Sequence, residues 1–103
     1  GYISVHLPRS WSYSGRLPLR LPARDDDPAC CDFDEDLFQA SSTGGHVLLD
    51  VGWYPSGDPA GKFICRFVVD CDWASATRDL ETRDVADVLR WLARRVAEET
   101  AKP

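Results

Sequence analysis

The stretch HVLLDVGWYPSGDPAGKFICRFVVD, residues 46–70, predicts a long β-hairpin at the centre of the fold. Apolar side chains alternate along residues 46–54 and again along residues 62–70, which is the period of two that a strand imposes. The intervening PSGDPAG consists of turn formers and supplies a loop longer than a two-residue turn. Both faces of the two strands are fairly apolar, which is typical of central strands.

Three further segments are expected to extend the hairpin into a sheet. Residues 2–7 alternate apolar and polar side chains until Pro8 ends the run. Residues 16–21 alternate as well, but Pro18 has no N–H to donate, so this segment is expected to be an edge strand or an extended segment. The chain between these two segments is expected to be a polar connection. The third strand is expected within residues 73–80.

A C-terminal helix is predicted from about residue 83 to residue 100, with Thr82 as its cap and Asp84 in its first turn. Five apolar side chains recur on one face of it at helical spacing: Val85, Val88, Leu89, Leu92 and Val96. Trp91 lies off this stripe. It either packs against a loop as a core residue or stays exposed as an anchor for a partner.

These elements predict an α+β fold, in which a mainly antiparallel sheet of about four to five strands packs against one C-terminal amphipathic helix. A short helix is also expected near residues 34–40, with Leu37 and Phe38 as its apolar contacts. The length of 103 residues fits a single domain, 1–103, with a core that needs no disulfide or metal. No apolar run is long enough to span a bilayer and no secretory signal is apparent, so a soluble, cytoplasmic protein is expected.

The four cysteines are Cys30, Cys31, Cys65 and Cys71. Their spacing matches no zinc-binding pattern, because Cys30 and Cys31 are adjacent and five residues separate Cys65 from Cys71. Free thiols in a reducing cytoplasm are the expectation, with a disulfide or a metal site as the alternatives. No cofactor is expected.

Charge is segregated along the chain. The net charge is -5, which argues against nucleic acid or an anionic membrane as a partner. Residues 25–36 carry seven carboxylates and no base. Such a segment must stay solvated or meet a cation, so it is either a solvated loop or a negative surface that docks a basic partner such as a nuclease cleft. A calcium loop is rejected, because the required glycine and closing glutamate are missing.

The sequence offers few residues that could form a catalytic site. Only His6 and His46 offer a base at neutral pH, and a site could be drawn from His46 with Asp50, Ser42 or Cys71. Their spacing fixes no such geometry, because a nucleophile needs a base and an orienting group within hydrogen-bond reach. A small enzyme or enzyme subunit with a pocket near His46 and Asp50 is therefore kept as an alternative.

Residues 44–96 resemble the small immunity proteins of bacterial polymorphic toxin and contact-dependent growth inhibition systems. The likeness consists of a strand that ends in Trp53 and Tyr54, a Gly/Asp/Pro hairpin, an acidic turn with Asp70, Asp72 and Trp73, and the amphipathic C-terminal helix. The resemblance implies a cytoplasmic, non-enzymatic protein that binds one cognate toxin domain and blocks its active site or substrate surface.

The charge pattern and the resemblance together predict an immunity protein that neutralises a cognate toxin, expected to be a basic nuclease, through an acidic surface that also carries aromatic anchors. The expected partner-binding residues are Asp32, Asp34, Glu35, Asp36, Trp53, Tyr54 and Trp91. Besides the small enzyme, a regulatory protein-interaction domain is an alternative.

Overall fold

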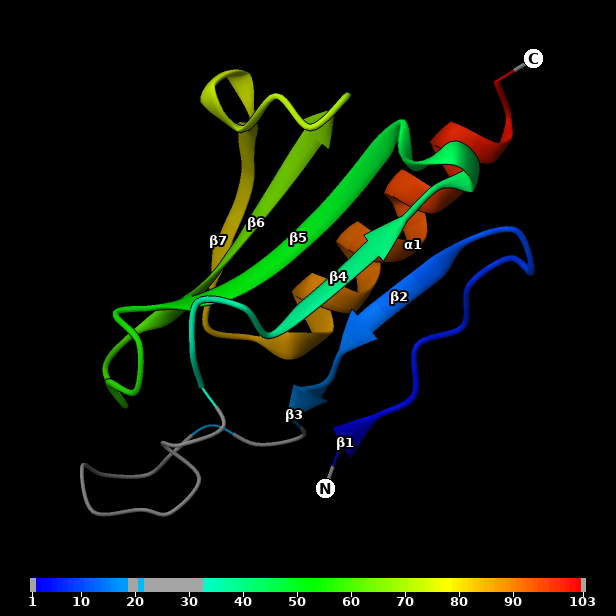
Figure 1. The fold of residues 1–103 in the computed structure, drawn as a ribbon. Coiled ribbons are helices and arrows are strands. Elements are labelled where there is room, and N and C mark those ends of the chain that lie inside the picture. Colours follow the sequence, from blue (N-terminus) through cyan, green and yellow to red (C-terminus); the bar gives the residue numbers. More distant parts are fainter. Residues whose placement is uncertain (1, 19–20, 22–32, 103) are drawn as a thin grey trace.

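The computed structural model describes residues 2–18, 21 and 33–102 and has an α+β fold, as expected from the sequence (Figure 1). Its main sheet has five antiparallel strands in the order β2-β4-β5-β6-β7, and β1 pairs with β3 in a second, two-stranded sheet. The strands are β1 (Tyr2–Ile3), β2 (Ser12–Gly15), β3 (Leu17–Pro18), β4 (Phe38–Ser41), β5 (Val47–Tyr54), β6 (Lys62–Val69) and β7 (Thr77–Thr82). The helices are α1 (Val85–Thr100) and two short 3-10 turns, η2 (Thr43–Gly45) and η3 (Trp73–Ser75).

The predicted hairpin is confirmed as β5 and β6, which pair from Val47↔Val69 to Tyr54↔Lys62. Directly opposite residues share a face of the sheet, so the apolar alternation of the two strands is in phase. One face packs toward α1 and is buried except at the end of β6, where Phe67 is partly buried and Val69 is exposed. It includes Val47, Leu49, Val51, Trp53, Phe63 and Cys65.

The C-terminal helix covers one face of the sheet, as Figure 1 shows for α1 behind β4 and β5. Val88 and Leu92 of the predicted stripe are buried, and its other members are partly buried against the core. The expected cap is wrong, because Thr82 is still part of β7. Asp84 caps the helix instead, and its carboxylate accepts a hydrogen bond of 2.9 Å from the backbone N–H of Ala86.

The short helix expected at residues 34–40 is wrong. Residues 38–41 form β4, which lies between β2 and β5. Phe38 pairs with Val51 and Ala40 pairs with Leu49, so both small and large apolar side chains of β4 join the face that α1 covers. The cross-strand partners supplied by β5 outweigh the weak local preference of so short a segment.

The N-terminal region also differs from expectation. The strand expected at residues 2–7 is limited to β1, which pairs with β3. Of the edge segment expected at residues 16–21, Leu17–Pro18 is confirmed as a strand, and residues 19–20 lie outside the described residues. Residues 12–15, expected to lie in a polar connection, form the edge strand β2. The strand expected within residues 73–80 is β7, which begins after η3.

Two of the four cysteines lie in the described part of the chain: Cys65 is a buried free thiol and Cys71 is an exposed one. Cys30 and Cys31 lie outside the described residues. Burial raises the pKa of Cys65 to about 12, so its thiol stays protonated and behaves as an apolar core group. Within the described ranges, no helix combines the length and the apolar composition that crossing a membrane requires.

Candidate functional site

Three of the expected partner-binding carboxylates lie on one exposed turn, Asp34–Asp36, which we call the acidic turn. Asp32 lies outside the described residues. Buried residues flank the turn on both sides: Phe33 before it and Leu37 after it. The Phe33 ring packs edge-on against Trp53 with 4.8 Å between centroids. The acidic turn is therefore tied to the core at both ends.

Backbone hydrogen bonds hold the acidic turn along β5. The N–H of Trp53 donates to the carbonyl of Asp34 at 2.9 Å, and the N–H of Leu37 donates to the carbonyl of Val51 at 3.1 Å. Between these two bonds, the carbonyl of Glu35 lies so close to Gly52 that a Cβ there would be 2.4 Å from the oxygen. The close approach requires glycine at this position.

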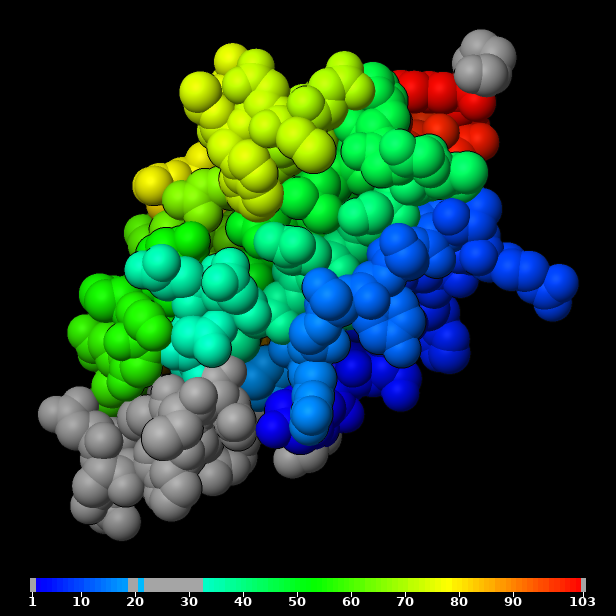
Figure 2. Space-filling model, in the orientation of Figure 1, coloured from blue at the N-terminus to red at the C-terminus, as the bar shows by residue number. Residues whose placement is uncertain are grey.

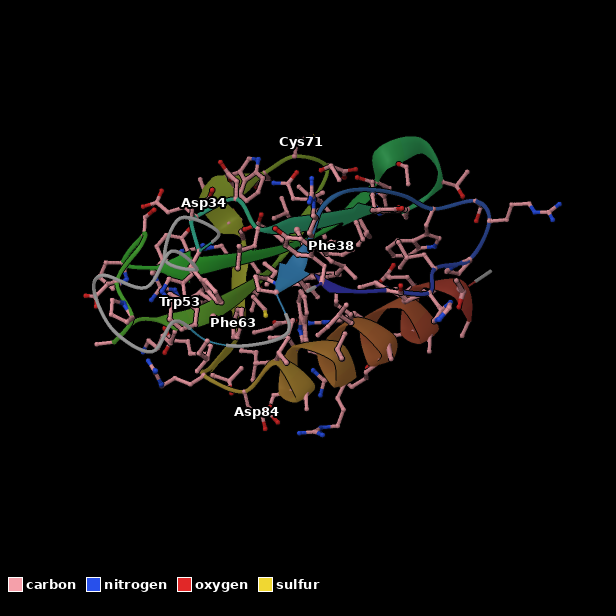
Figure 3. The ribbon with its side chains drawn as sticks, turned by 90° about the horizontal axis from the view of Figure 1, so that it is seen from below. Asp34, Phe38, Trp53, Phe63, Cys71 and Asp84 are labelled. Carbon is pink, nitrogen blue, oxygen red and sulfur yellow. The ribbon has the colours of Figure 1, made fainter. Side chains whose placement is uncertain are left out.

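The carboxylates of the acidic turn take part in no ion pair among the described residues. The carboxylates on the helix side are mostly paired, as in Arg95–Asp79, Arg94–Glu98 and Lys102–Glu99. Figure 3 places Asp34 on the side of the sheet opposite α1 and Asp84 on the helix side. The three carboxylates of the acidic turn, which have no ion pair among the described residues, therefore lie on the side away from the helix, where Arg66 of β6 also lies.

A second carboxylate on that face, Asp50, is only 3% exposed. Its cross-strand neighbours are Gln39 on β4 and Arg66 on β6. Gln39 Nε2 donates a hydrogen bond of 3.0 Å to its Oδ1. Burial raises the pKa of Asp50, the bond from Gln39 and the charge of Arg66 oppose this shift, and the charge of Asp36 reinforces it.

Tyr54 is half-buried on the same face as Asp50. Its hydroxyl accepts a hydrogen bond of 3.0 Å from Arg66, whose guanidinium also lies 5.0 Å from the ring centroid. The side chain is therefore fixed by a cation–π and hydrogen-bond contact, with part of its surface accessible. Of the expected aromatic residues, Tyr54 is the one with some exposure.

Trp53 and Trp91 are buried, with 0% and 3% exposure, so the expectation of exposed anchors at these positions is wrong. Trp53 packs between Phe33 and Phe63. The indole of Trp91 donates a hydrogen bond of 3.0 Å to Asp79. Of the two alternatives for Trp91, the structure supports the core residue.

The sequence interpretation did not select Trp73 as a binding residue, yet it is the exposed tryptophan, at 48%. It begins η3, which joins β6 to β7 and has no buried residue. Figure 2 shows residues 70–76 and the acidic turn on the same face of the molecule, the face away from α1. The available signal was the position of Trp73 beside Asp72 in the loop between two strands.

His46 and Asp50, the centre of the alternative enzyme site, do not come together. Three residues of β5 lie between them, which places their Cα atoms about 13 Å apart. His46 Nδ1 instead lies 2.5 Å from Asp70 Oδ1, and both side chains are exposed.

His46 also lines a cavity of about 590 Å³ together with Ser10, Ser42 and Thr43. Thr100 lines the cavity too, and three of these hydroxyls are engaged with backbone. Ser42 Oγ accepts from the N–H of Val47, Thr43 Oγ1 donates to the carbonyl of Ser10, and Thr100 Oγ1 donates to the carbonyl of Val96. None of these three hydroxyls has a hydrogen bond to His46 among the described contacts.

Within the described part of the chain, no group of three or more His, Cys, Asp or Glu side chains is placed to hold a metal ion. No protein-family model matches the chain, and neither the curated proteins nor the solved structures contain a match. The functional argument therefore rests on the geometry and charge of the residues described above.

Proposed function

We propose that this chain is a non-enzymatic immunity protein that binds and neutralises one basic toxin domain with the exposed turn and loop on the side of the sheet opposite α1. One observation carries the proposal: Asp34, Glu35 and Asp36 are exposed, take part in no ion pair among the described residues, and lie on a turn tied to the core at Phe33 and Leu37. A regulatory binding domain with a basic partner would use the same surface, and the identity of the partner separates the two.

Fixed carboxylates suit this task better than a mobile acidic loop. The turn is held by Trp53 and Val51, so its charges need little further ordering when a partner docks. Like charges placed together on a surface create a field that draws in a basic partner and raises the association rate. The acidic turn therefore supplies steering and orientation, and neighbouring side chains must supply contact area.

A nuclease toxin is the partner class that this charge favours. A nuclease binds phosphates through a basic cleft, and that cleft attracts a preorganised row of carboxylates. An inhibitor that occupies the cleft excludes the nucleic acid directly. Asp50 lies beneath the same face, where the charge of Arg66 opposes its own, so the exposed carboxylates of the acidic turn supply the negative field.

The test is protection in cells. The probe is the protein encoded by the gene immediately upstream of this one, expressed from an inducible promoter with and without this chain. The proposal predicts that the upstream protein arrests growth alone, that this chain restores growth, and that the two form a one-to-one complex. Growth arrest that this chain does not relieve, with no complex formed, would contradict it.

The contact between His46 and Asp70 favours one second candidate, a hydrolytic function at the cavity that His46 lines. A carboxylate on Nδ1 orients the imidazole and leaves Nε2 as a base. If hydrolysis at His46 were the source of the protection described above, His46→Ala would abolish that protection while leaving binding of the upstream-encoded protein unchanged. The immunity proposal predicts protection by the His46→Ala variant.

A further inference from the structure

We propose that Trp73 is the apolar anchor of the binding surface and inserts into an apolar pocket rimmed by arginine or lysine on the partner. This inference rests on the proposed function and identifies the contact that gives the complex its lifetime. Tryptophan is enriched among the few residues that contribute most of the binding energy of an interface. It has this effect where an indole that is exposed in the free protein becomes fully desolvated in the complex.

The four tryptophans of the chain divide sharply by exposure. Trp11, Trp53 and Trp91 belong to the core, whereas the side chain of Trp73 is 48% exposed. Trp73 therefore offers more apolar surface to a partner than either tryptophan expected from the sequence.

The turn that carries Trp73 is firmly hydrogen-bonded. The N–H of Asp72 donates to the carbonyl of Val69 at 3.0 Å, and the N–H of Ala76 donates to the carbonyl of Trp73 at 3.2 Å. Asp72 also accepts a bond of 3.3 Å from the N–H of Ser75 through its carboxylate. An indole on such a turn loses little backbone freedom on binding, which is the condition for a strong anchor.

Charge around Trp73 defines the partner's chemistry. Residues 69–77 carry Asp70 and Asp72 and no base, and the next residue, Arg78, is paired with Glu81. Asp70 contacts His46, and Asp72 has no ion pair among the described residues. A pocket that accepts the indole must therefore present arginine or lysine at its rim, and this requirement matches the basic partner that the acidic turn favours.

One partner can cover both features. The acidic turn bonds to β5 at Trp53, and the N–H of Asp70, in the loop before η3, bonds to the carbonyl of His46 at the start of β5. Six residues of β5 lie between His46 and Trp53, which places the two points about 23 Å apart. A standard interface buries about 800 Å² on each partner, which corresponds to a patch about 30 Å across. Figures 2 and 3 place both regions on the side of the sheet away from α1.

The other exposed aromatic residues lack this setting. Tyr13 is 67% exposed but stacks on Phe38, and the guanidinium of Arg16 lies over the ring of Tyr2 at 4.8 Å. Tyr2 thus has a cation beside it where Trp73 has carboxylates. Tyr13 provides the matched control, because it is a large exposed aromatic on an edge strand.

The experiment measures binding of an inactive form of the upstream-encoded toxin domain to wild type, Trp73→Ala and Tyr13→Ala, with circular dichroism to show that each variant folds. Trp73→Ala is expected to weaken binding at least about 30-fold, chiefly through faster dissociation, whereas Tyr13→Ala stays within about 3-fold of wild type. Equal affinity of Trp73→Ala and wild type would overturn the inference and leave the proposed function standing.

A second readout needs no variant of the anchor. Acrylamide, a neutral quencher, reaches exposed indoles, so the free chain should show a quenchable fluorescence component from Trp73. That component should disappear in the complex, read against the toxin domain alone as a blank. Unchanged quenching in a complex that does form would place Trp73 outside the interface. If wild type forms no complex, the proposed function itself fails.

Discussion

The indole Nε1 of Trp91 donates a hydrogen bond of 3.0 Å to Oδ2 of Asp79, and this bond links α1 to the edge strand β7. Arg95 binds the same carboxylate, and its guanidinium also lies 4.1 Å from the centroid of Phe67. Asp79 sits where the register of β6 and β7 shifts, which brings an acidic side chain to the helix side of the sheet.

Removing that carboxylate should destabilise the fold. Asp79→Ala leaves the Trp91 N–H without its acceptor and leaves Arg95 with Glu98 as its ion-pair partner. A lost hydrogen bond to a charged group costs about 1.5 to 3 kcal/mol. Urea unfolding measures the change. Glu98→Gln, which removes an exposed charge near Arg95, is the control and should change stability by less than about 0.5 kcal/mol. If Asp79→Ala lowers the free energy of unfolding no more than Glu98→Gln does, the contacts of Asp79 with Trp91 and Arg95 contribute little to stability.

A second prediction concerns the contact between the acidic turn and β5. Gly52→Ala places a Cβ against the carbonyl of Glu35, so the turn must move or the strand must shift. Overpacking of this kind costs about 1 to 3 kcal/mol. Ser14→Ala, on the exposed edge strand β2, is the control and should be close to neutral. An unchanged stability of Gly52→Ala would show that the turn does not lie where the structure places it.

The raised pKa of Asp50 predicts how the stability of the fold depends on pH. Burial raises its pKa in the folded state above the ordinary value of 3.8. Between the two values the folded state binds more protons than the unfolded chain, so this group's contribution to stability falls as pH rises through the folded pKa. Asp50→Asn should therefore be more stable than wild type at pH 7, and the difference should shrink as pH falls toward 4.

The measurement for Asp50 is urea unfolding of wild type and Asp50→Asn at several pH values between 7 and 4. Asp36→Asn gives a further check, because the charge of Asp36 contributes to the raised pKa of Asp50. In Asp36→Asn, the fall in stability with rising pH should therefore occur at lower pH than in wild type. A stability difference between wild type and Asp50→Asn that is the same at every pH would contradict the assigned cause.

The sequence predicted the elements whose patterns are long. The eight residues of β5 and of β6 repeat the strand period several times, and the stripe on α1 runs over three turns, so local pattern and tertiary packing agree. The four residues of β4 repeat the period only twice, and their identity as a strand depends on pairing with β5. Such pairing is not encoded locally.

The charge of the candidate site could be predicted from the sequence. The exposure of its aromatic residues was less predictable. Runs of carboxylates must reach solvent, so the exposure of Asp34 followed from the sequence. The burial of Trp91 depends on Asp79, twelve residues away on another element, and a helical pattern does not reveal that partner. The exposure of Trp73 depends on η3 projecting from the sheet, which is a property of the loop conformation.

The binding role of the acidic turn is tested by the association rate constant of the inactive toxin domain at two ionic strengths. The test variant is Asp34→Asn/Glu35→Gln/Asp36→Asn. Its asparagine at position 34 keeps a side-chain oxygen that can accept the hydrogen bond from the N–H of Asp36 in wild type. The control removes the same charge from the helix side: Asp84→Asn/Glu98→Gln/Glu99→Gln. We predict that the test variant associates about 10-fold more slowly at low salt, that the deficit shrinks at high salt, and that the control stays near wild type. Equal rate constants for the test variant and wild type at both ionic strengths would contradict a binding role for the acidic turn.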